Sequence, residues 1–524
     1  MPGRATTIHW HGIRQTDTPH MDGVPMITQC PILTGNIFRY KFLADTPGTF
    51  FWHSHDGFQK MDGIVGSLVV RESAKADINN DLYDDDLPSH VVLIQDWMHL
   101  DSDQRFPGLL SHDIGQAPDS YLVNGKGNFP KLIGNTDTPF SQFDVDAGRR
   151  YRFRFIGGSC LSCPFQVTIE DHPLLLIATE STPVEPVVVN SFNMWPGDRY
   201  DFVLDANKRP NSYWIFVRGL GLCSKANQAA VLKYKSWPLL LPLTGRPPLW
   251  GLTSGSTGVV LNPENSGCRG KDKGICVSQL RGKKHMDKSL MALHPNTRIL
   301  LTFGFHIFTR DELFYQNKYP RYFTPVTGTP MTAWINNISN VMPASPLLTQ
   351  LEDVPLNMFC SKKCLEPLRN AKPCQCINLI KVPLGSTVEL IMVDPSPLNL
   401  GLSHPMHIHG FNFKILTQGR FSLKEDINAA IKKIQKHLIE GTFIKPNPPV
   451  KDTINVPAFG YAIVRFVADN PGYWYFHCHF LYHHIAGMSA VFQVGEHKDF
   501  PRPPKHFQKC GDFMPPINSS SKTR

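Results

Sequence analysis

Short apolar runs, rather than long helical stripes, set the pattern of this chain. Tyr473-Trp474-Tyr475-Phe476 is one such run, and its aromatic content is typical of a buried strand. The 44 prolines and 39 glycines supply frequent turns between such runs. Because 524 residues are too many for one core, roughly two to four domains are expected. The pattern therefore predicts an all-β, turn-rich protein.

One unit of strand, turn and strand occurs three times. Residues 38–55 and 463–479 share the order strand, Ala-Asp-x-Pro-Gly turn, aromatic strand and His-x-His, and residues 199–219 form a weaker copy without the histidines. Three copies predict three related β domains. An acidic linker at 77–86 follows the first of them. The predicted division is residues 1–75, 88–235 and 295–505, with a Pro/Gly/Ser-rich linker at 236–294.

One segment within the third domain has a helical pattern instead. Its apolar residues recur on one helical face: Ile427, Ile431, Ile434 and Leu438. Ser422 and Glu425, just before them, resemble a capping box. We expect a surface helix inserted here, with a structural role.

Composition narrows the class of protein. The net charge of +9 is spread along the chain without a basic stripe, so nucleic acid is not an expected partner. No apolar run is long enough to span a membrane. Twelve cysteines suit an oxidising compartment, and Asn337 and Asn518 begin possible glycosylation sequons. We expect a secreted monomer. Since no signal segment opens the sequence and the first histidine strand begins almost at once, we also expect that the first domain is truncated at its N-terminus.

The stretch from His477 to Met488 carries the most specific chemistry. Side chains alternate along a strand, so His477 and His479 point to one face and Cys478 to the other. His483 and Met488 can return to the cysteine side if the strand breaks after His479. Two histidines, a cysteine and a weak axial methionine make a blue-copper site. One strand end can thus serve two metal sites that a single covalent path connects.

Three further histidine motifs complete the set. They are His9-Trp10-His11, His53-Ser54-His55 and His404-Pro405-Met406-His407-Ile408-His409. Zinc also binds cysteine and histidine, but it needs four ligands and closes its shell. Ten histidines, one cysteine and one methionine in this order favour several copper ions instead.

These four motifs resemble the copper loops of multicopper oxidases, and the resemblance covers nearly the whole chain. The stretches that look most like the insect laccase branch are Lys451-Asp452-Thr453-Ile454, Ala468-Asp469-Asn470-Pro471-Gly472 and Gln29-Cys30-Pro31-Ile32. The resemblance implies three cupredoxin-like Greek-key β-sandwiches and four copper ions. It also implies oxidation of phenols, diphenols or aromatic amines, one electron at a time, coupled to reduction of dioxygen to water.

The resemblance also implies a role for each ligand. Carried over by motif, the type 1 copper is held by His404, Cys478, His483 and axial Met488. The type 2 copper is held by His9 and His407. One type 3 copper is held by His11, His53 and His479, and the other by His55, His409 and His477. Electrons would pass through Cys478 to His477 and His479.

Three positions concern protons. Glu180 matches a family position whose carboxylate holds the substrate phenol and could accept its proton. Asp22 matches a family carboxylate near the three-copper cluster. Leu481 stands where the family has an acid, and it would face the cluster if the strand continued that far. We therefore expect Asp22 to be the remaining proton relay.

The other histidines and cysteines have structural interpretations. His484 is expected to be a polar neighbour of the ligands, and His20, His112 and His306 surface or core residues. Four cysteines could bind zinc, but disulfides are favoured in a secreted chain: Cys360, Cys364, Cys374 and Cys376. The resemblance suggests one further pair, Cys30 with Cys510.

Two alternatives to a laccase-like enzyme stay open. A ferrous-iron oxidase on the same fold would need carboxylates beside His404 or His483, and none is adjacent in sequence. A copper-free structural or binding protein could keep the scaffold, although the intact ligand set argues against it.

Overall fold

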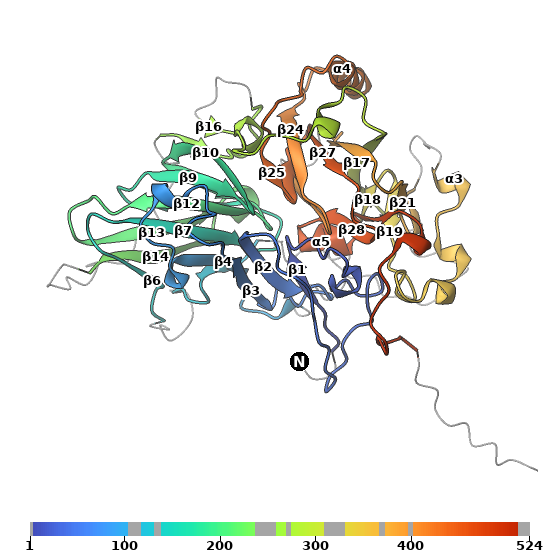
Figure 1. The fold of residues 1–524 in the computed structure, drawn as a ribbon, viewed down its shortest axis with the longest axis horizontal. Coiled ribbons are helices and arrows are strands. Elements are labelled where there is room, and N and C mark those ends of the chain that lie inside the picture. The colour runs from blue at the N-terminus through green and yellow to red at the C-terminus, as the bar shows by residue number, and fades with distance from the viewer. Residues whose placement is uncertain are drawn as a thin grey trace, which may run out of the picture.

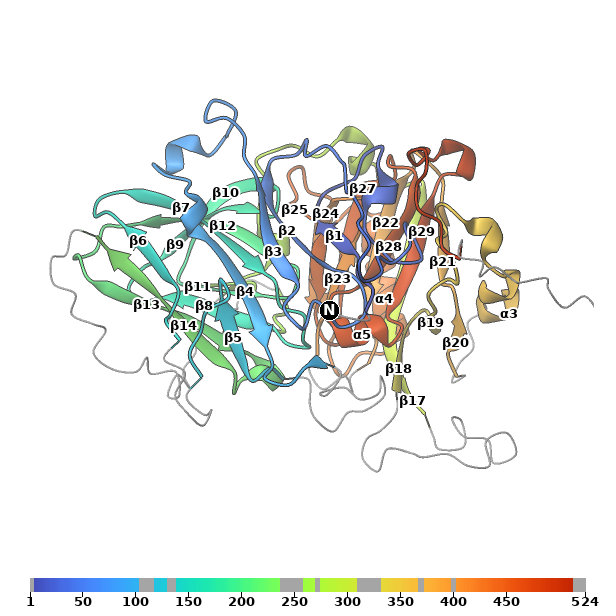
Figure 2. The ribbon, with the colours of Figure 1, turned by 90° about the horizontal axis from the view of Figure 1, so that it is seen from below.

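The computed structural model describes residues 4–102, 117–129, 138–235, 258–268, 274–308, 331–365, 372–396 and 402–511. His112, Asn518 and residues 236–257 of the predicted linker lie outside them. Strands dominate, as predicted, and they form five sheets. The N-terminal sheet lies between a middle body and a C-terminal body (Figures 1 and 2).

The N-terminal sheet has the order β1-β2-β3 and comprises β1 (Ile8–His11), β2 (Gly48–Ser54) and β3 (Val65–Val70). Residues 38–44, predicted as a strand, do not form one. A strand needs a hydrogen-bonded neighbour, and no described segment pairs with this one along its length. Instead the Tyr40 hydroxyl accepts a hydrogen bond from Ile8 N at 2.9 Å.

The middle body contains two sheets. The first comprises, in spatial order, β10 (Thr182–Val189), β9 (Leu174–Thr179), β12 (Arg199–Asp205), β7 (Arg150–Gly157), β4 (Val91–Trp97) and β5 (Ser120–Val123). The second comprises β16 (Gly274–Ile275), β15 (Val260–Leu261), β11 (Ser191–Met194), β8 (Phe165–Ile169), β13 (Ser212–Gly219), β14 (Asn227–Tyr234) and β6 (Gln142–Val145). Phe153 and Phe202 of the first sheet share one core with Phe165 and Ile215 of the second.

The C-terminal body also contains two sheets. The first comprises β20 (Cys374–Cys376), β19 (Ile338–Asn340), β18 (Met331–Ile335), β17 (Thr297–Ile307), β22 (Thr387–Val393), β27 (Gly460–Val467), β24 (Phe413–Arg420) and β25 (Val450–Lys451). The second comprises β21 (Leu379–Val382), β29 (Ser489–Val494), β28 (Gly472–Cys478), β23 (His404–Ile408) and β26 (Thr453–Val456). Each body thus packs two sheets around shared apolar side chains, as β-sandwiches do.

The predicted linker at residues 236–294 also contains two short strands. They are β15 and β16, and they extend a sheet of the middle body. The predicted domain boundaries themselves stay a prediction. Short 3-10 turns occur at Pro19–Met21, Asn80–Leu82, Pro88–His90, Gly221–Cys223, Val277–Gln279, Lys288–Met291, Leu351–Asp353, Leu356–Met358 and His497–Asp499.

Helices are few among the described residues: α3 (Lys362–Leu365), α4 (Ile427–Ile439) and α5 (Leu481–Ile485). The predicted helical face of α4 is confirmed, because Ile434 and Leu438 are buried against the sheet and Ile427 packs beside them. The predicted capping box at Ser422 and Glu425 is wrong. Asp426 caps the helix instead, and its side chain accepts a hydrogen bond from Ala429 N.

Ten of the cysteines form disulfides: Cys30–Cys510, Cys163–Cys223, Cys268–Cys276, Cys360–Cys376 and Cys364–Cys374. The predicted bridge from Cys30 to Cys510 and the disulfide interpretation of the four-cysteine cluster are therefore confirmed. Cys160 and Cys478 remain free thiols, and both are buried.

Candidate metal centre

Two pairs of neighbouring strands bring the predicted ligands together. β1 runs antiparallel to β2 with His9 opposite His53, and β23 runs antiparallel to β28 with His407 opposite His477. Directly opposed residues on such strands have side chains in contact. The His9 ring also stacks on the His409 ring at 3.8 Å between centroids. The N-terminal sheet and the C-terminal body therefore build one histidine cluster between them.

Four groups of potential ligand atoms each lie within 4.8 Å of one another: His9, His11 and His407; His11, His53 and His479; His55, His409 and His477; and His404, Cys478 and His483. All these side chains are buried. The last three groups contain the histidines and the cysteine predicted for the two type 3 coppers and the type 1 copper, and the first adds His11 to the pair predicted for the type 2 copper. A fifth group joins His9, Asp22 and His409. The assignment of each ligand to a copper is still a prediction.

Most cluster histidines use one ring nitrogen to bind the protein. Nδ1 lies close to a backbone carbonyl in His9 (2.8 Å from Asp22 O), His53 (2.8 Å from Ser54 O), His407 (3.0 Å from Asp452 O) and His477 (2.9 Å from Cys478 O). Such bonds fix the tautomer and the ring orientation of a metal ligand. Three other nitrogens are buried without a partner among the described residues: His11 Nδ1, His53 Nε2 and His55 Nε2. A buried unpaired nitrogen is costly, and a metal ion would satisfy it, so this donor set fits copper.

Carboxylates orient two further ligands. Asp22 Oδ2 lies 2.8 Å from His409 Nδ1, and Asp452 Oδ1 lies 3.0 Å from His11 Nε2. Burial by itself would raise the pKa of Asp22, but the facing His409 and His9 hold it well below its usual range. A carboxylate that stays ionised orients its partners better than it donates protons. Asp22 therefore lies where it can orient His409, and its role as a proton relay stays a prediction.

The thiol site lies on the other face of β28. Cys478 Sγ is 3.6 Å from His483 Nδ1 and 3.8 Å from His404 Nδ1, so a single ion could bind all three. Burial raises the pKa of the Cys478 thiol. Met488 is buried beside the site, and its backbone carbonyl accepts a hydrogen bond from Cys478 N at 3.1 Å. His483 reaches the site because β28 ends at Cys478 and the chain then turns back, and the axial role of Met488 stays a prediction.

Glu180 does not lie where a substrate could reach it, so its predicted contact with the phenol is wrong. It is 1% exposed, and it lies 2.7 Å from Lys451 Nζ and 3.5 Å from Arg199. Burial raises its pKa to about 8. Arg199 binds both carboxylate oxygens of Asp452, so Glu180 belongs to a charge cluster behind His11.

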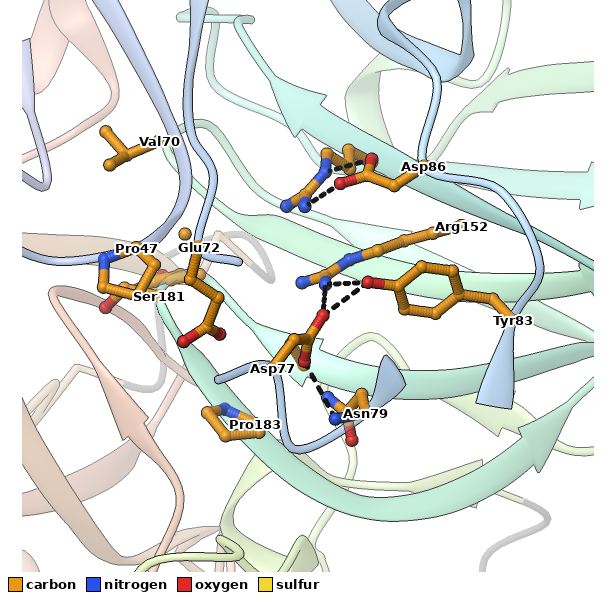
Figure 3. A pocket seen from close by; sticks show the side chains of 14 residues that line it. Pro47, Val70, Glu72, Asp77, Asn79, Tyr83, Asp86, Arg152, Ser181 and Pro183 are labelled. Carbon is orange, nitrogen blue, oxygen red and sulfur yellow. Dashed lines mark hydrogen bonds and ion pairs between the residues drawn. The ribbon is translucent and has the colours of Figure 1, made fainter. Parts of the chain in front are cut away.

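The cavity beside Glu180 is small and polar. It has a volume of about 40 Å³, which is too little for an aromatic ring. Figure 3 shows Arg152 bound to Asp77 and Tyr83 across this cavity. Arg154 binds Asp86 in the same way, so the acidic linker is held to the middle body by ion pairs. The cavity is a junction between ion-paired segments, and its volume is too small for a phenol ring.

Leu481 also lies elsewhere than predicted. Because β28 ends at Cys478, Leu481 is the first residue of α5, and it does not continue the strand face. It packs with Met61, Met98 and Cys160 in an apolar cluster. The expectation that Leu481 faces the histidine cluster as a strand residue is therefore wrong.

A larger cavity, of about 290 Å³, adjoins the thiol site. Ser403, directly before His404, and Phe480 line it, and the Phe480 ring lies 5.2 Å from the His483 ring. Glu264 lines it too, and burial raises the pKa of its carboxyl group. Burial is the one cause of this shift, and no hydrogen-bond or charged partner among the described residues contributes to it. Sequence reasoning missed Glu264 because no motif surrounds it.

Lys60 also lies at the cluster, although its sequence context gave no indication of this. Three histidines were predicted to be structural: His484, His20 and His306. Lys60 is buried, with Nζ 3.3 Å from His479 Nδ1, and burial lowers its pKa to about 8. His484, predicted to be a polar neighbour, contacts the His477 ring at 4.4 Å. His20 is a buried core residue and His306 is half-buried.

Comparisons with known proteins show which family has a similar sequence and fold. Three family models, each described as multicopper oxidase, match residues 3–75, 88–237 and 340–498. Laccase-5 of Trametes versicolor is 30% identical, with 93% of this chain and 79% of the relative covered. L-ascorbate oxidase of Cucumis sativus is 29% identical, with 96% and 82% covered. The structure of the laccase from Botrytis aclada has a TM-score of 0.71 and 25% identity, with 96% and 80% covered. The resemblance to the insect branch stays a prediction.

Within the described residues, no helix is long and apolar enough to cross a membrane. The β-sheets, the histidine groups and the sequence matches along the chain all indicate the same family. The chain therefore belongs to the multicopper oxidase family, as a laccase-like, cupredoxin-type enzyme that uses copper.

Proposed function

We propose that the four ligand groups hold four copper ions and that the enzyme couples oxidation of phenolic substrates to reduction of dioxygen to water. When bound, copper at the Cys478 site accepts single electrons, and copper at the histidine cluster delivers them to dioxygen. The proposal rests on one observation. The ligand group of His404, Cys478 and His483 is joined to the histidine cluster through His477 and His479, which flank Cys478 in sequence.

The chain's own residues supply position and insulation. Cys478 lies between two cluster histidines, so only the backbone of one strand end separates the two sites. Asp22, Asp452 and backbone carbonyls hold the rings in place. Burial of the ligands excludes bulk water from both sites. These features match an enzyme that must retain several electrons at fixed positions.

The test is copper analysis combined with oxygen stoichiometry. Copper-loaded protein should contain four copper ions, absorb strongly in the visible region and consume one dioxygen for four electrons taken from a diphenol. A protein that binds no copper, or that releases hydrogen peroxide as the main product, would contradict the proposal and favour a structural role on the same scaffold.

We propose that substrate binds in the cavity beside Phe480 and Ser403, with Glu264 as the contact for a phenol hydroxyl or an aromatic amine. An unpaired carboxylate can accept both a hydrogen bond and the proton that a phenol releases as it loses an electron. Glu264→Gln should raise KM and lower kcat/KM about tenfold or more for phenols, since one charge-assisted hydrogen bond contributes about 1.5–3 kcal/mol. Oxidation of ferrocyanide, which has no hydroxyl group, is the matched control and should change little.

Ferrous iron is a second candidate substrate, because folding brings a carboxylate to the thiol site. Asp394 Oδ2 lies 4.0 Å from His404 Nε2, and Glu264 lines the adjoining cavity. Asp394 is fully buried and accepts hydrogen bonds from Ser396 N and Phe459 N, which favours an orienting role. Paired assays with a diphenol and ferrous iron decide between the two, and we expect the diphenol to be the better substrate.

We further propose that the enzyme works outside the cell as a monomer. Five disulfides join its loops, which suits an oxidising compartment. Asn337, in the turn after β18, is half-buried and is the candidate glycosylation site within the described residues. Glycan analysis of secreted protein and sedimentation of the purified enzyme test these two points.

A further inference from the structure

A tyrosine and a histidine that the proposed mechanism does not use lie against the histidine cluster. Tyr475 precedes His477 by two residues on β28, so both side chains point to the same face. The Tyr475 ring lies 5.1 Å from the His477 ring and 5.8 Å from the His55 ring, measured between centroids. Tyr475 is 1% exposed. A buried phenol therefore contacts two ligands of one predicted type 3 copper.

His484 is the partner of this phenol. It lies on α5, directly after His483, and its Nε2 is 3.1 Å from the Tyr475 hydroxyl. The His484 ring also lies 4.4 Å from the His477 ring. The same hydroxyl also contacts Ser489 Oγ at 2.8 Å and Met342 Sδ at 3.6 Å. Of these three neighbours, the imidazole nitrogen is the strongest base and so the best acceptor of a phenol proton.

We propose that Tyr475 and His484 form a redox pair that can supply one electron and one proton to the cluster; this rests on the proposed copper function. The phenol O–H bond breaks, its proton moves to His484 Nε2 along the existing contact, and its electron goes to the copper site. The oxidant is dioxygen, which the proposed activity supplies. Tyr475 is left as a neutral phenoxyl radical, and one electron from substrate with the proton from His484 restores it.

The pair would act when substrate is scarce. Reduction of dioxygen to two waters takes four electrons, and the three coppers of the cluster hold three. The fourth normally comes through Cys478. If that site is still oxidised, a phenol in contact with His477 can complete the reduction and prevent release of partly reduced oxygen.

The same strand carries a matched control. Tyr473 points to the same face as Tyr475 and is also buried, and its hydroxyl lies 3.0 Å from His497 Nε2. Its described ring contacts are with His497 and Phe500, and none is with a cluster histidine. Tyr473→Phe therefore removes an equivalent tyrosine–histidine pair that lies away from the cluster.

The experiment uses the full-length, copper-loaded Cys478→Ser enzyme, whose reduced cluster holds three electrons. It is reduced without oxygen, mixed with dioxygen and frozen, and electron paramagnetic resonance is recorded together with copper content and oxygen consumption. We expect an organic radical whose spectrum narrows when the protein contains ring-deuterated tyrosine. Tyr475→Phe should abolish this radical, Tyr473→Phe should retain it, and His484→Gln should reduce its yield.

The outcomes separate this inference from the function on which it rests. Oxygen consumption without a radical, or a radical that survives Tyr475→Phe, would overturn the redox pair and leave the copper function intact. A protein without copper or oxygen consumption would overturn both. If Tyr475→Phe does not fold, His484→Gln decides, because an unchanged radical yield in that variant contradicts the proton acceptor. In the enzyme with Cys478, Tyr475→Phe should release more hydrogen peroxide at low substrate than Tyr473→Phe does.

Discussion

A histidine ring has two nitrogens, and in most cluster histidines one of them is bound by an oxygen atom of the protein. Backbone carbonyls bind Nδ1 in His9, His53, His407 and His477, and this contact leaves Nε2 directed to the cluster. In His11 the arrangement is reversed, because Asp452 binds Nε2 and Nδ1 stays free. In these five histidines, oxygen atoms outside the metal site therefore set the orientation of the imidazole ring.

Cys478→Ser tests the thiol site. The blue colour of a type 1 site arises from the copper–thiolate bond, and a serine hydroxyl cannot replace that bond. The variant should lose the intense visible band and the oxidation of diphenols, and should keep the three coppers of the histidine cluster. Absorption spectra and copper content measure this, and a blue, active Cys478→Ser protein would refute the assignment.

Asp452→Ala tests orientation of the cluster. Removing the carboxylate at His11 Nε2, which leaves Thr453 Oγ1 as the other oxygen contact, should weaken copper binding about 10- to 100-fold, as loss of such outer contacts typically does. Competition with a chelator measures the affinity. Asp201→Ala is the control, because Asp201 is buried and binds Arg152 and Arg154 without touching a histidine. If both variants lose copper equally, the effect is general destabilisation.

At the scale of elements, the end of β28 decides which side chains meet. The strand places Cys478 in the core and His477 against the cluster, and α5 then turns His483 back to the thiol. The same change from strand to helix moves Leu481 into an apolar cluster with Met61, Met98 and Cys160. An acid at this position would therefore meet apolar neighbours.

Leu481→Glu should destabilise the fold. Leu481 is 8% exposed, and an unpaired carboxylate at this site would cost about 2 kcal/mol or more, besides the lost apolar contacts. Denaturant unfolding of the copper-loaded protein measures the change, with Leu481→Met as the control of similar volume. Unchanged stability together with faster reoxidation by dioxygen would show that the carboxylate reaches the cluster after all.

At the scale of the whole molecule, the cluster joins segments that are far apart in sequence. His9 and His407 lie 398 positions apart, and their Nε2 atoms are 3.4 Å apart. The Cys30–Cys510 disulfide closes the same junction at its edge. Figure 2 shows β1 and β2 beside β23 and β28. Contact between the N-terminal sheet and the C-terminal body is thus part of the site itself.

Removal of copper should loosen this junction. A ligand that binds the folded state alone stabilises it, by about 4 kcal/mol at a thousandfold excess over Kd. Chelation should therefore lower the unfolding temperature and expose the loops between β1 and β2 to protease. Differential scanning calorimetry with limited proteolysis measures both. Equal unfolding temperatures with and without copper would contradict a shared site.

The copper-free protein should also be sensitive to acid. Burial lowers the pKa of His404 to about 3 and that of His484 to about 3, compared with 6.5 in the unfolded chain. Below pH 6.5 the unfolded state then binds more protons than the folded state, so stability falls as pH decreases. The slope is about 1.4 kcal/mol per pH unit for each such histidine. Guanidinium unfolding between pH 7 and pH 5 measures this loss, and a flat profile would contradict buried neutral histidines.

The all-β class, the ligand motifs and the faces of β28 could be predicted from the sequence, because they depend on local composition and on the alternation of neighbouring side chains. The sequence could not place Glu180, Leu481 or the 38–44 segment. Where a strand ends, and whether it finds a partner, depends on contacts between residues far apart in sequence. Only the tertiary structure placed Glu264 beside the thiol site and Tyr475 beside His484, since no motif links these residues. Burial and pairing of charges are properties of the assembled chain, so tertiary structure alone decided them.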